Sequence, residues 1–284
     1  MPRTERIHIS DLPDATVDCV CDAIATFTVG LTRNVREGNR ERAFLIGTGT
    51  LVTVNRSHCI LTAGHVVAQL GDSDYLGLVS SFAGRYGRQV FEKSILQIHA
   101  VGPGQDESKG PDIAVVVLPQ AQIGSLLAEK SFFSIDNRRA RFAEAFLEKN
   151  RGFWFMVGVV GESEEQLDPI PGSVQTKAWW GLCGRFSMPR EYEELGFDYL
   201  DVQVDYRTAA RDLPSSFGGF SGAGVWQVPL RKNREGDIEA EEFVLSGVAF
   251  YQTPLADGAR HLKCHGRRAV YEKIPELVQR TARS

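Results

Sequence analysis

The sequence predicts an all-β protein made of two β units, and three features of the chain support this prediction. Short apolar or β-branched runs separated by turn residues dominate residues 43–118. A stretch rich in helix formers follows at 138–149. Strand-like runs then resume between residues 153 and 251. Strands at this close spacing are typical of sandwiches and closed barrels rather than of βαβ units.

The first β unit contains short strand-like runs bounded by glycine and other turn formers. Closing such a small sheet into a barrel would remove its exposed edges. The predicted strands are 43–46, 51–54, 59–62, 75–79, 94–98 and 113–118.

The second β unit is separated from the first by a helical connector at 138–149, which has apolar residues on one side. The charged loop 231–242 predicts a long hairpin tip at the surface. The predicted strands are 153–160, 173–180, 199–204, 224–228 and 243–251.

A terminal helix is predicted over 268–280, interrupted only by Pro275, and we expect it to pack on the second β unit. Its apolar residues recur at helical spacing: Val270, Ile274, Leu277 and Val278.

Composition and charge exclude several classes of protein. The 284 residues carry a formal net charge of −4, with 43% hydrophobic and 24% charged residues. These values exclude a disordered tail, a collagen-like fibre and a disulfide-dense miniprotein. The slightly negative net charge does not indicate a basic surface of the kind that binds nucleic acid or an anionic membrane, so neither is expected as a partner.

The cysteines and the N-terminus predict a soluble cytoplasmic protein. The five cysteines are odd in number and scattered, which favours a reducing compartment. Residues 1–16 are charged and lack the apolar run of a signal peptide. The apolar stretch 17–31 is broken by Asp18 and Asp22 and is too short to span a bilayer.

Three local patterns carry residues with catalytic chemistry. His65 follows small residues at the end of a predicted strand, which leave its imidazole unobstructed. Asp112 stands at the start of an apolar strand. Ser221 lies in the glycine-rich turn 218–224, where glycines permit a sharp turn and expose backbone N–H groups.

These patterns together resemble the three signature blocks of the chymotrypsin/trypsin-like serine proteases. The chain order His65, Asp112, Ser221 is the order of this family. Residues 47–52 resemble the strand before the histidine block in bacterial members, and 247–251 resemble the strand that lines the substrate groove. The resemblance covers roughly residues 43–251.

The resemblance implies one trypsin-like peptidase domain spanning 1–284, with two packed six-stranded antiparallel β-barrels and short helices at the N-terminus, connector and C-terminus. The site would lie between the barrels, with His65 and Asp112 on the first and Ser221 on the second. The implied parts are an N-terminal extension at 1–40, a first barrel at 41–135, a connector at 136–152, a second barrel at 153–255 and a C-terminal helix at 256–284.

By this resemblance, the chain is a serine endopeptidase acting on polypeptides without metal or organic cofactor. Ser221 Oγ attacks the peptide carbonyl, His65 transfers the proton, and Asp112 orients the imidazole. The N–H groups of Gly219 and Ser221 form the oxyanion hole.

Departures from the family pattern alter the expected substrate pocket. Ser215 stands six residues before Ser221, where the family places the base of the specificity pocket. Because it is not acidic, a strict preference for Lys or Arg is not expected. Phe250, Tyr251 and Gln252 complete the predicted substrate-binding residues, and Phe250 and Gln252 replace smaller residues. We therefore expect a narrowed pocket.

Two further departures concern activation and a disulfide. Phe220 replaces the acidic residue that secreted members use after zymogen cleavage, so no such switch is expected. Val66 stands where a cysteine partner for Cys59 would be, so no disulfide is expected there.

Other readings remain open at the level of sequence. The same scaffold can serve as a peptide- or protein-binding module with little or no turnover, and an esterase or self-processing enzyme is a third option. An intracellular protease needs its activity limited, and we expect the narrow pocket or a regulatory protein partner to limit it here. The sets Cys19/Cys21 and His261/Cys264/His265 lack the paired spacing of a structural zinc site.

Overall fold

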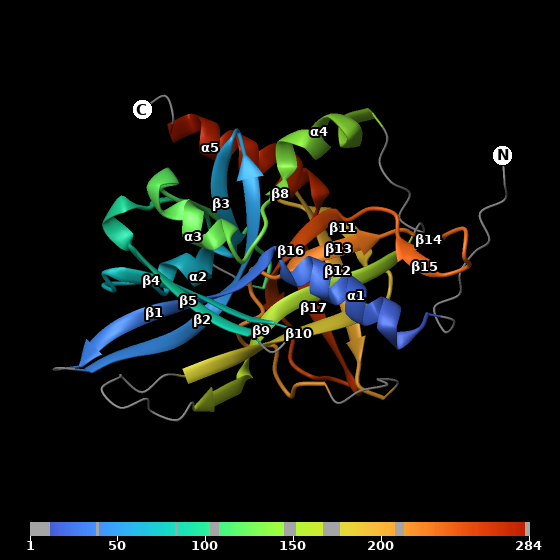
Figure 1. Cartoon of the computed structure of the whole chain (residues 1–284), viewed down its shortest axis with the longest axis horizontal. Helices are drawn as coiled ribbons and strands as arrows, with labels where there is room; N and C mark the ends of the chain where they lie inside the picture. The colour runs from blue at the N-terminus through green and yellow to red at the C-terminus, as the bar shows by residue number, and fades with distance from the viewer. Residues whose placement is uncertain are drawn as a thin grey trace.

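Two antiparallel sheets form most of the structure, flanked by short helices (Figure 1). The computed structural model describes residues 12–37, 40–82, 85–102, 108–144, 152–166, 177–207 and 213–281. The predicted strand at 173–180 and the helix at 138–149 lie partly outside these residues. The coarser part of the fold prediction, a mostly β chain with two antiparallel sheets, is confirmed.

The first sheet has the strand order β5-β4-β1-β2-β3-β7-β6, and a short parallel strand, β8, pairs with β2. Its strands are β1 (Thr28–Glu37), β2 (Arg40–Val54), β3 (Ser57–Thr62), β4 (Tyr75–Phe82), β5 (Arg85–Glu92), β6 (Gln97–Val101), β7 (Ile113–Val117) and β8 (Phe133–Ser134).

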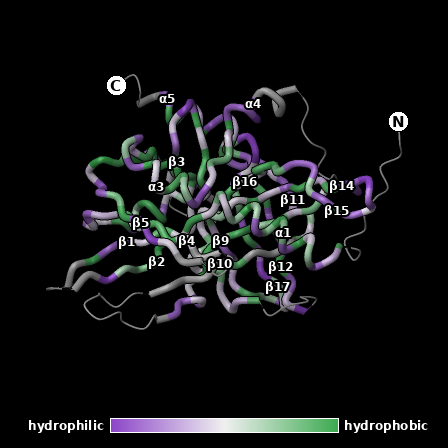
Figure 2. The backbone as a smooth tube through the Cα atoms, viewed as in Figure 1, coloured by the Kyte–Doolittle hydropathy of each residue, from purple (hydrophilic) through white to green (hydrophobic). Residues whose placement is uncertain are grey.

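The second sheet has the order β10-β9-β13-β16-β17-β12-β11, beside a separate hairpin of β14 and β15. The strands are β9 (Phe153–Gln166), β10 (Lys177–Phe186), β11 (Arg190–Glu194), β12 (Phe197–Asp205), β13 (Gly224–Val228), β14 (Leu230–Lys232), β15 (Ile238–Ala240), β16 (Val244–Gln252) and β17 (Ala259–His265). The β14–β15 hairpin lies in the charged segment 231–242 and is hydrophilic (Figure 2).

Short helices lie at the N-terminus, in the connector and at the C-terminus, as expected. They include α1 (Asp14–Ala25), α4 (Ile135–Glu144) and α5 (Ile274–Thr281), preceded by the π-helical η4 (Ala269–Lys273). The remaining helical turns are α2 (Gly64–Ala68), η2 (Lys93–Ile95), η3 (Gln120–Gln122) and α3 (Ile123–Leu127). None of the helices in the described ranges combines the length and hydropathy needed to cross a membrane.

The sheets have eight and seven strands rather than the expected six each. The strand β1 lies in the range assigned to an N-terminal extension, yet it pairs with both β2 and β4. The strand β11 is highly charged because it is an exposed edge, so it gave no apolar signal. The division of the chain into domains stays a prediction.

Two strands predicted at 43–46 and 51–54 are one continuous strand, β2. Gly47 and Gly49 suggested a turn between them, but they serve close packing within the strand. A Cβ on Gly47 would lie 2.6 Å from Val66 Cγ2, and one on Gly49 would lie 2.4 Å from Ile60 Cγ2. Glycine is therefore required there by crowding rather than by a turn.

One hydrophobic core joins both sheets and both terminal helices. Trp226 of β13 is fully buried and stacks on Phe27 with ring centroids 5.4 Å apart. The same cluster contains Ile24 of α1 and Ile274 of α5. The expected packing of the terminal helix on the second unit is correct only for η4, which contacts β16, because α5 contacts β7 and β2 of the first sheet.

The cysteines are not all reduced. Cys19, Cys59 and Cys264 are free, whereas Cys21 is disulfide-bonded. Since disulfides are typical of oxidising compartments, this bond weighs against the expected cytoplasmic location, which stays a prediction.

Candidate active site

The pairing of β3 with β7 brings His65 and Asp112 together. Thr62 lies opposite Ala114 in this antiparallel ladder, so residues just beyond the two strand ends meet. His65 stands in the first turn of α2, and its Nδ1 lies 2.5 Å from Asp112 Oδ2. The His65 backbone N–H also donates to Asp112 Oδ1 at 2.8 Å. The carboxylate thus holds both the ring and the backbone of His65.

Burial fixes the roles of the two groups. Asp112 is 1% exposed, and a buried carboxylate requires hydrogen-bond donors. Because ionised Asp112 only accepts, the proton of a neutral His65 ring lies on Nδ1. The other ring nitrogen, Nε2, then carries a lone pair and can accept a proton. The His65 side chain is 25% exposed, so this nitrogen is accessible from the cavity.

Ser221 lies in a tight turn between β12 and β13. Phe220 N–H donates to the Phe217 carbonyl, and Ala223 N–H donates to the Phe220 carbonyl, each at 2.9 Å. Gly219 has a φ of +93°, a conformation that favours glycine. The turn therefore depends on the glycines that surround the serine.

Contacts from neighbouring strands set the direction of this turn. The Gly218 carbonyl accepts from Gly161 N–H of β9 at 2.7 Å. The Gly219 carbonyl accepts from Thr48 Oγ1 of β2, also at 2.7 Å. Within the described residues, neither Gly219 N–H nor Ser221 N–H donates a hydrogen bond. Both donors named from the sequence are therefore available to an acceptor beside Ser221.

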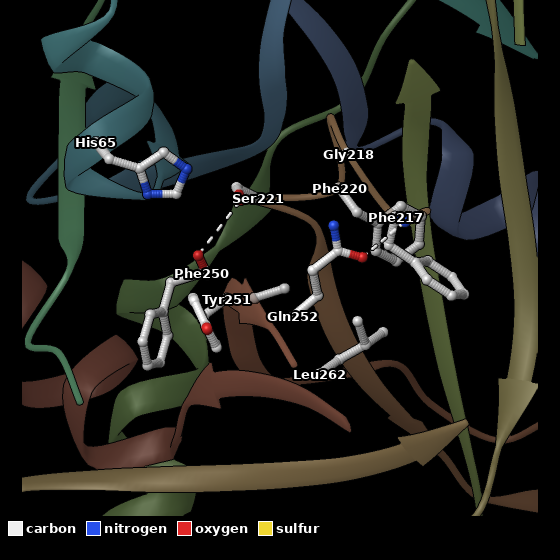
Figure 3. Close-up of a pocket in the computed structure, with 10 residues that line it drawn as sticks. His65, Phe217, Gly218, Phe220, Ser221, Phe250, Tyr251, Gln252 and Leu262 are labelled. Atoms are coloured by element: carbon white, nitrogen blue, oxygen red, sulfur yellow. Dashed lines mark hydrogen bonds between the residues drawn. The ribbon is translucent and has the colours of Figure 1, made fainter. Parts of the chain in front are cut away.

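Ser221 and His65 face one another across a single cavity (Figure 3). The Ser221 hydroxyl donates to the Phe250 carbonyl at 3.4 Å, and no described hydrogen bond joins it to His65. Rotation of the serine side chain about χ1 moves its oxygen between staggered positions. Catalytic contacts of this kind are commonly loose before substrate binds.

The cavity beside Ser221 has a volume of about 270 Å³ and is mostly apolar. Three of the predicted substrate-binding residues, Phe250, Tyr251 and Gln252, line it. The full set of lining residues is His65, Phe217, Gly218, Phe220, Ser221, Ala249, Phe250, Tyr251, Gln252 and Leu262.

Ser215, the fourth predicted substrate-binding residue, is not among the cavity-lining residues. Its N–H donates to Glu162 Oε2 at 2.9 Å, and its hydroxyl also donates to the Glu162 carboxylate. Hydrogen bonding to the Ser215 side chain, offset in part by desolvation, holds the pKa of Glu162 below its ordinary value. Ser215 is therefore engaged with an ionised carboxylate at the surface.

Gln252 bridges two walls of the cavity (Figure 3). Its Oε1 accepts from Phe217 N–H at 2.8 Å and from Arg260 at 2.6 Å. Its Nε2 donates to Ser216 Oγ at 2.9 Å. The amide therefore ties the end of β16 to the segment that leads into the Ser221 turn.

Two residues of this site were not singled out by sequence reasoning. Thr48 entered the sequence analysis only as one of residues 47–52, which resemble a strand of the family. Its position between two glycines was a signal that another part of the chain packs closely against this strand. His265 was considered only as part of a set that lacks zinc-site spacing, and it is fully buried. Its Nε2 accepts from Asp112 N–H at 3.0 Å, a contact that no local pattern could reveal.

The comparisons with known proteins add little to this geometry. No family model and no curated protein matches the chain. One solved structure of Sesbania mosaic virus VPg protein, described in terms of aromatic interactions that drive coupled folding and binding, is 15% identical. The match covers 86% of this chain and 89% of that chain, with a TM-score of 0.40. Likeness at this level does not establish a shared activity.

Proposed function

We propose that the protein is a chymotrypsin-like serine endopeptidase that hydrolyses peptide bonds through Ser221, His65 and Asp112. The observation that carries this proposal is the contact of buried Asp112 with His65 Nδ1, which leaves the second ring nitrogen, Nε2, for the cavity that contains Ser221. The two N–H groups of Gly219 and Ser221 support it, because they can bind a developing oxyanion.

The proposed reaction proceeds through an acyl-enzyme. Ser221 Oγ attacks the substrate carbonyl carbon while His65 Nε2 takes the hydroxyl proton. Asp112 stabilises the imidazolium, and the carbonyl oxygen becomes an oxyanion bound by Gly219 and Ser221 N–H. When the C–N bond breaks, Nε2 returns the proton to the leaving amine. A water molecule, deprotonated by His65, then attacks the acyl-enzyme. The ester bond to Ser221 breaks, Ser221 Oγ takes the proton back from His65, and the carboxylate product leaves.

The proposed substrate is a polypeptide with an uncharged side chain before the scissile bond. Apolar and uncharged polar groups share the cavity wall, and no Asp, Glu, Lys or Arg among the described residues lines it. The bridge made by Gln252 limits the depth available to a side chain. An ionised substrate side chain would lose its hydration without a partner in this cavity.

A binding module with little turnover is the second candidate, and one observation favours it. The Ser221 hydroxyl donates to the Phe250 carbonyl rather than to His65. If this hydrogen bond persists in solution, Ser221 is held away from its base. The cavity would then hold a peptide without cleaving it, in a manner suited to a protein partner.

Labelling with a fluorophosphonate probe tests the two candidates. The parent protein is compared with Ser221→Ala and with His65→Ala, with folding of all three checked by circular dichroism. We expect labelling of the parent only, since the probe requires an activated serine. A folded parent protein that resists labelling would instead support the binding module.

A further inference from the structure

The last residue of β17, His265, contacts the backbone of Asp112 from the opposite sheet. His265 is fully buried, and its Nε2 lies 3.0 Å from the Asp112 nitrogen. The ladder of β7 begins only at Ile113, so the Asp112 N–H lies just outside the sheet pairing. A buried backbone N–H needs an acceptor, and His265 supplies it.

We propose that neutral His265 is a positioning residue that fixes Asp112, and through Asp112 the ring of His65. The proposal rests on the function proposed above. His265 lies on β17, in the sheet that carries Ser221, and it holds Asp112, which belongs to the other sheet. One side chain that touches no substrate thereby sets the position of Asp112 and His65 relative to Ser221.

The surroundings of His265 select the protonation state that this role requires. Because Nε2 accepts from an N–H, the ring proton of neutral His265 lies on Nδ1. The ring packs between aromatic side chains, with centroid distances of 4.8 Å to Phe250 and 5.1 Å to Tyr199. Burial lowers the pKa of His265 to about 4, although the Asp112 carboxylate opposes this shift. The imidazole is therefore neutral, and an acceptor, near pH 7.

The contacts of Asp112 explain why its backbone needs this support. Within the described residues, both hydrogen bonds to its carboxylate come from His65. Phe250, whose ring covers His265, has no donor to offer the carboxylate. The orientation of the Asp112 carboxylate thus depends on how the backbone of Asp112 is held. A small rotation of that backbone would move the His65 imidazole away from Ser221.

A role in packing alone is the competing explanation. The Nδ1 of His265 is buried and has no hydrogen-bond partner among the described residues. An unpaired buried nitrogen lowers stability. If His265 only filled space, an apolar side chain of similar size would therefore serve at least as well. A Leu at this position would therefore preserve packing and remove only the acceptor, whereas Gln would retain an acceptor at a similar reach.

The first test measures the protonation of His265 in the parent protein by ¹⁵N NMR at pH 7. We expect Nε2 to show the shift of an unprotonated ring nitrogen and Nδ1 that of a protonated one. A proton on Nε2 would overturn the proposal. This measurement requires neither turnover nor a variant, so it stands apart from the success of the proposed function.

The second test compares His265→Leu with His265→Gln and with Val20→Ala. Val20 is a buried control on α1, in a hydrophobic cluster that contains no cavity-lining residue. The readouts are the His65 Nδ1 proton resonance, the rate of fluorophosphonate labelling, and kcat and KM for any peptide that is cleaved. We expect the Leu variant to shift or broaden the resonance and to label at least about tenfold more slowly, with kcat reduced more than KM is changed. The Gln variant should recover most of the rate, and Val20→Ala should lower stability only.

A folded Leu variant with the parental resonance and labelling rate would leave His265 with a packing role only. If the parent protein itself fails to label, the proposed function fails, yet the His65 resonance still reports whether His265 positions Asp112.

Discussion

Thr48 Oγ1 donates a hydrogen bond to the Gly219 carbonyl oxygen at 2.7 Å, across 171 positions of sequence and from one sheet to the other. The same hydroxyl accepts from Val159 N–H at 2.9 Å. Thr48 is fully buried, so each of these groups depends on it. By holding the Gly219 carbonyl, Thr48 fixes the orientation of the peptide between Gly219 and Phe220, directly before Ser221.

Replacing Thr48 with Val should therefore damage the site. The change keeps the shape but removes one donor and one acceptor, which costs about 1–3 kcal/mol of stability. Loss of a single oxyanion-hole donor lowers kcat by about 10²–10³ in other enzymes, so a disturbed turn should lose up to this much. Steady-state kinetics and chemical denaturation check both effects. Thr48→Ser, which keeps the hydroxyl, should remain close to the parent; equal losses in Ser and Val variants would contradict this role.

Asp112→Asn should disable the proton transfer while preserving the fold. An amide at this position can donate to His65 Nδ1, which favours the tautomer with a proton on Nε2. That tautomer cannot accept the proton of Ser221, and the corresponding change in the best-studied triad lowers kcat by about 10⁴. Fluorophosphonate labelling rates measured beside a thermal melt check this expectation. Labelling within tenfold of the parent rate would show that Asp112 does not orient the base.

Gln252→Ala should widen the range of side chains accepted by the cavity. The change removes the bridge to Ser216 and Phe217 and frees volume next to Ser221. We expect a shift toward larger apolar residues before the scissile bond in a peptide library. Gln252→Leu, which breaks the bridge but fills the space, is the matched control and should keep the profile of the parent protein. An unchanged profile in both variants would place the specificity elsewhere.

His265 should make the fold sensitive to acid. Its pKa is lowered from 6.5 to about 4 in the folded state, chiefly by burial. Below pH 6.5 the unfolded chain binds a proton that the folded protein does not, so stability falls as the pH drops from about 6.5 to about 4. The shift corresponds to about 3 kcal/mol over this window. Urea denaturation at pH 7 and pH 5 should detect about 2 kcal/mol of this loss. The His265→Gln variant should show a flatter dependence of stability on pH. An equally steep dependence in that variant would assign the effect to other groups.

Local motifs explain why the residues of the candidate site could be proposed from the sequence. His65, Asp112 and Ser221 each stand at a strand end that is visible in the chain, and β13 has the predicted bounds 224–228. Ser215 was assigned to the pocket by its distance from Ser221, but Glu162 on another strand engages it. Such a contact depends on how distant strands are placed, which local sequence does not encode.

The errors in the fold have similar physical causes. β1 resembled an extension because its apolar residues alternate with Thr28, Thr32 and Asn34, polar residues that are also buried. The long strand β2 was divided because glycines that permit close packing look like glycines that form turns. The contact of His265 with Asp112 joins the ends of two strands that are far apart in sequence.

The shared core has a consequence for the order in which the molecule is built during synthesis. Val20 near the start and Val278 near the end of the described chain belong to the same buried cluster as Trp226. Contacts this distant in sequence form slowly and cannot close until the last helix has left the ribosome. The two sheets, and the groups His65, Asp112 and Ser221 divided between them, are therefore fixed relative to one another only after α5 has been synthesised. A nascent chain that lacks α5 would not yet hold these three groups together.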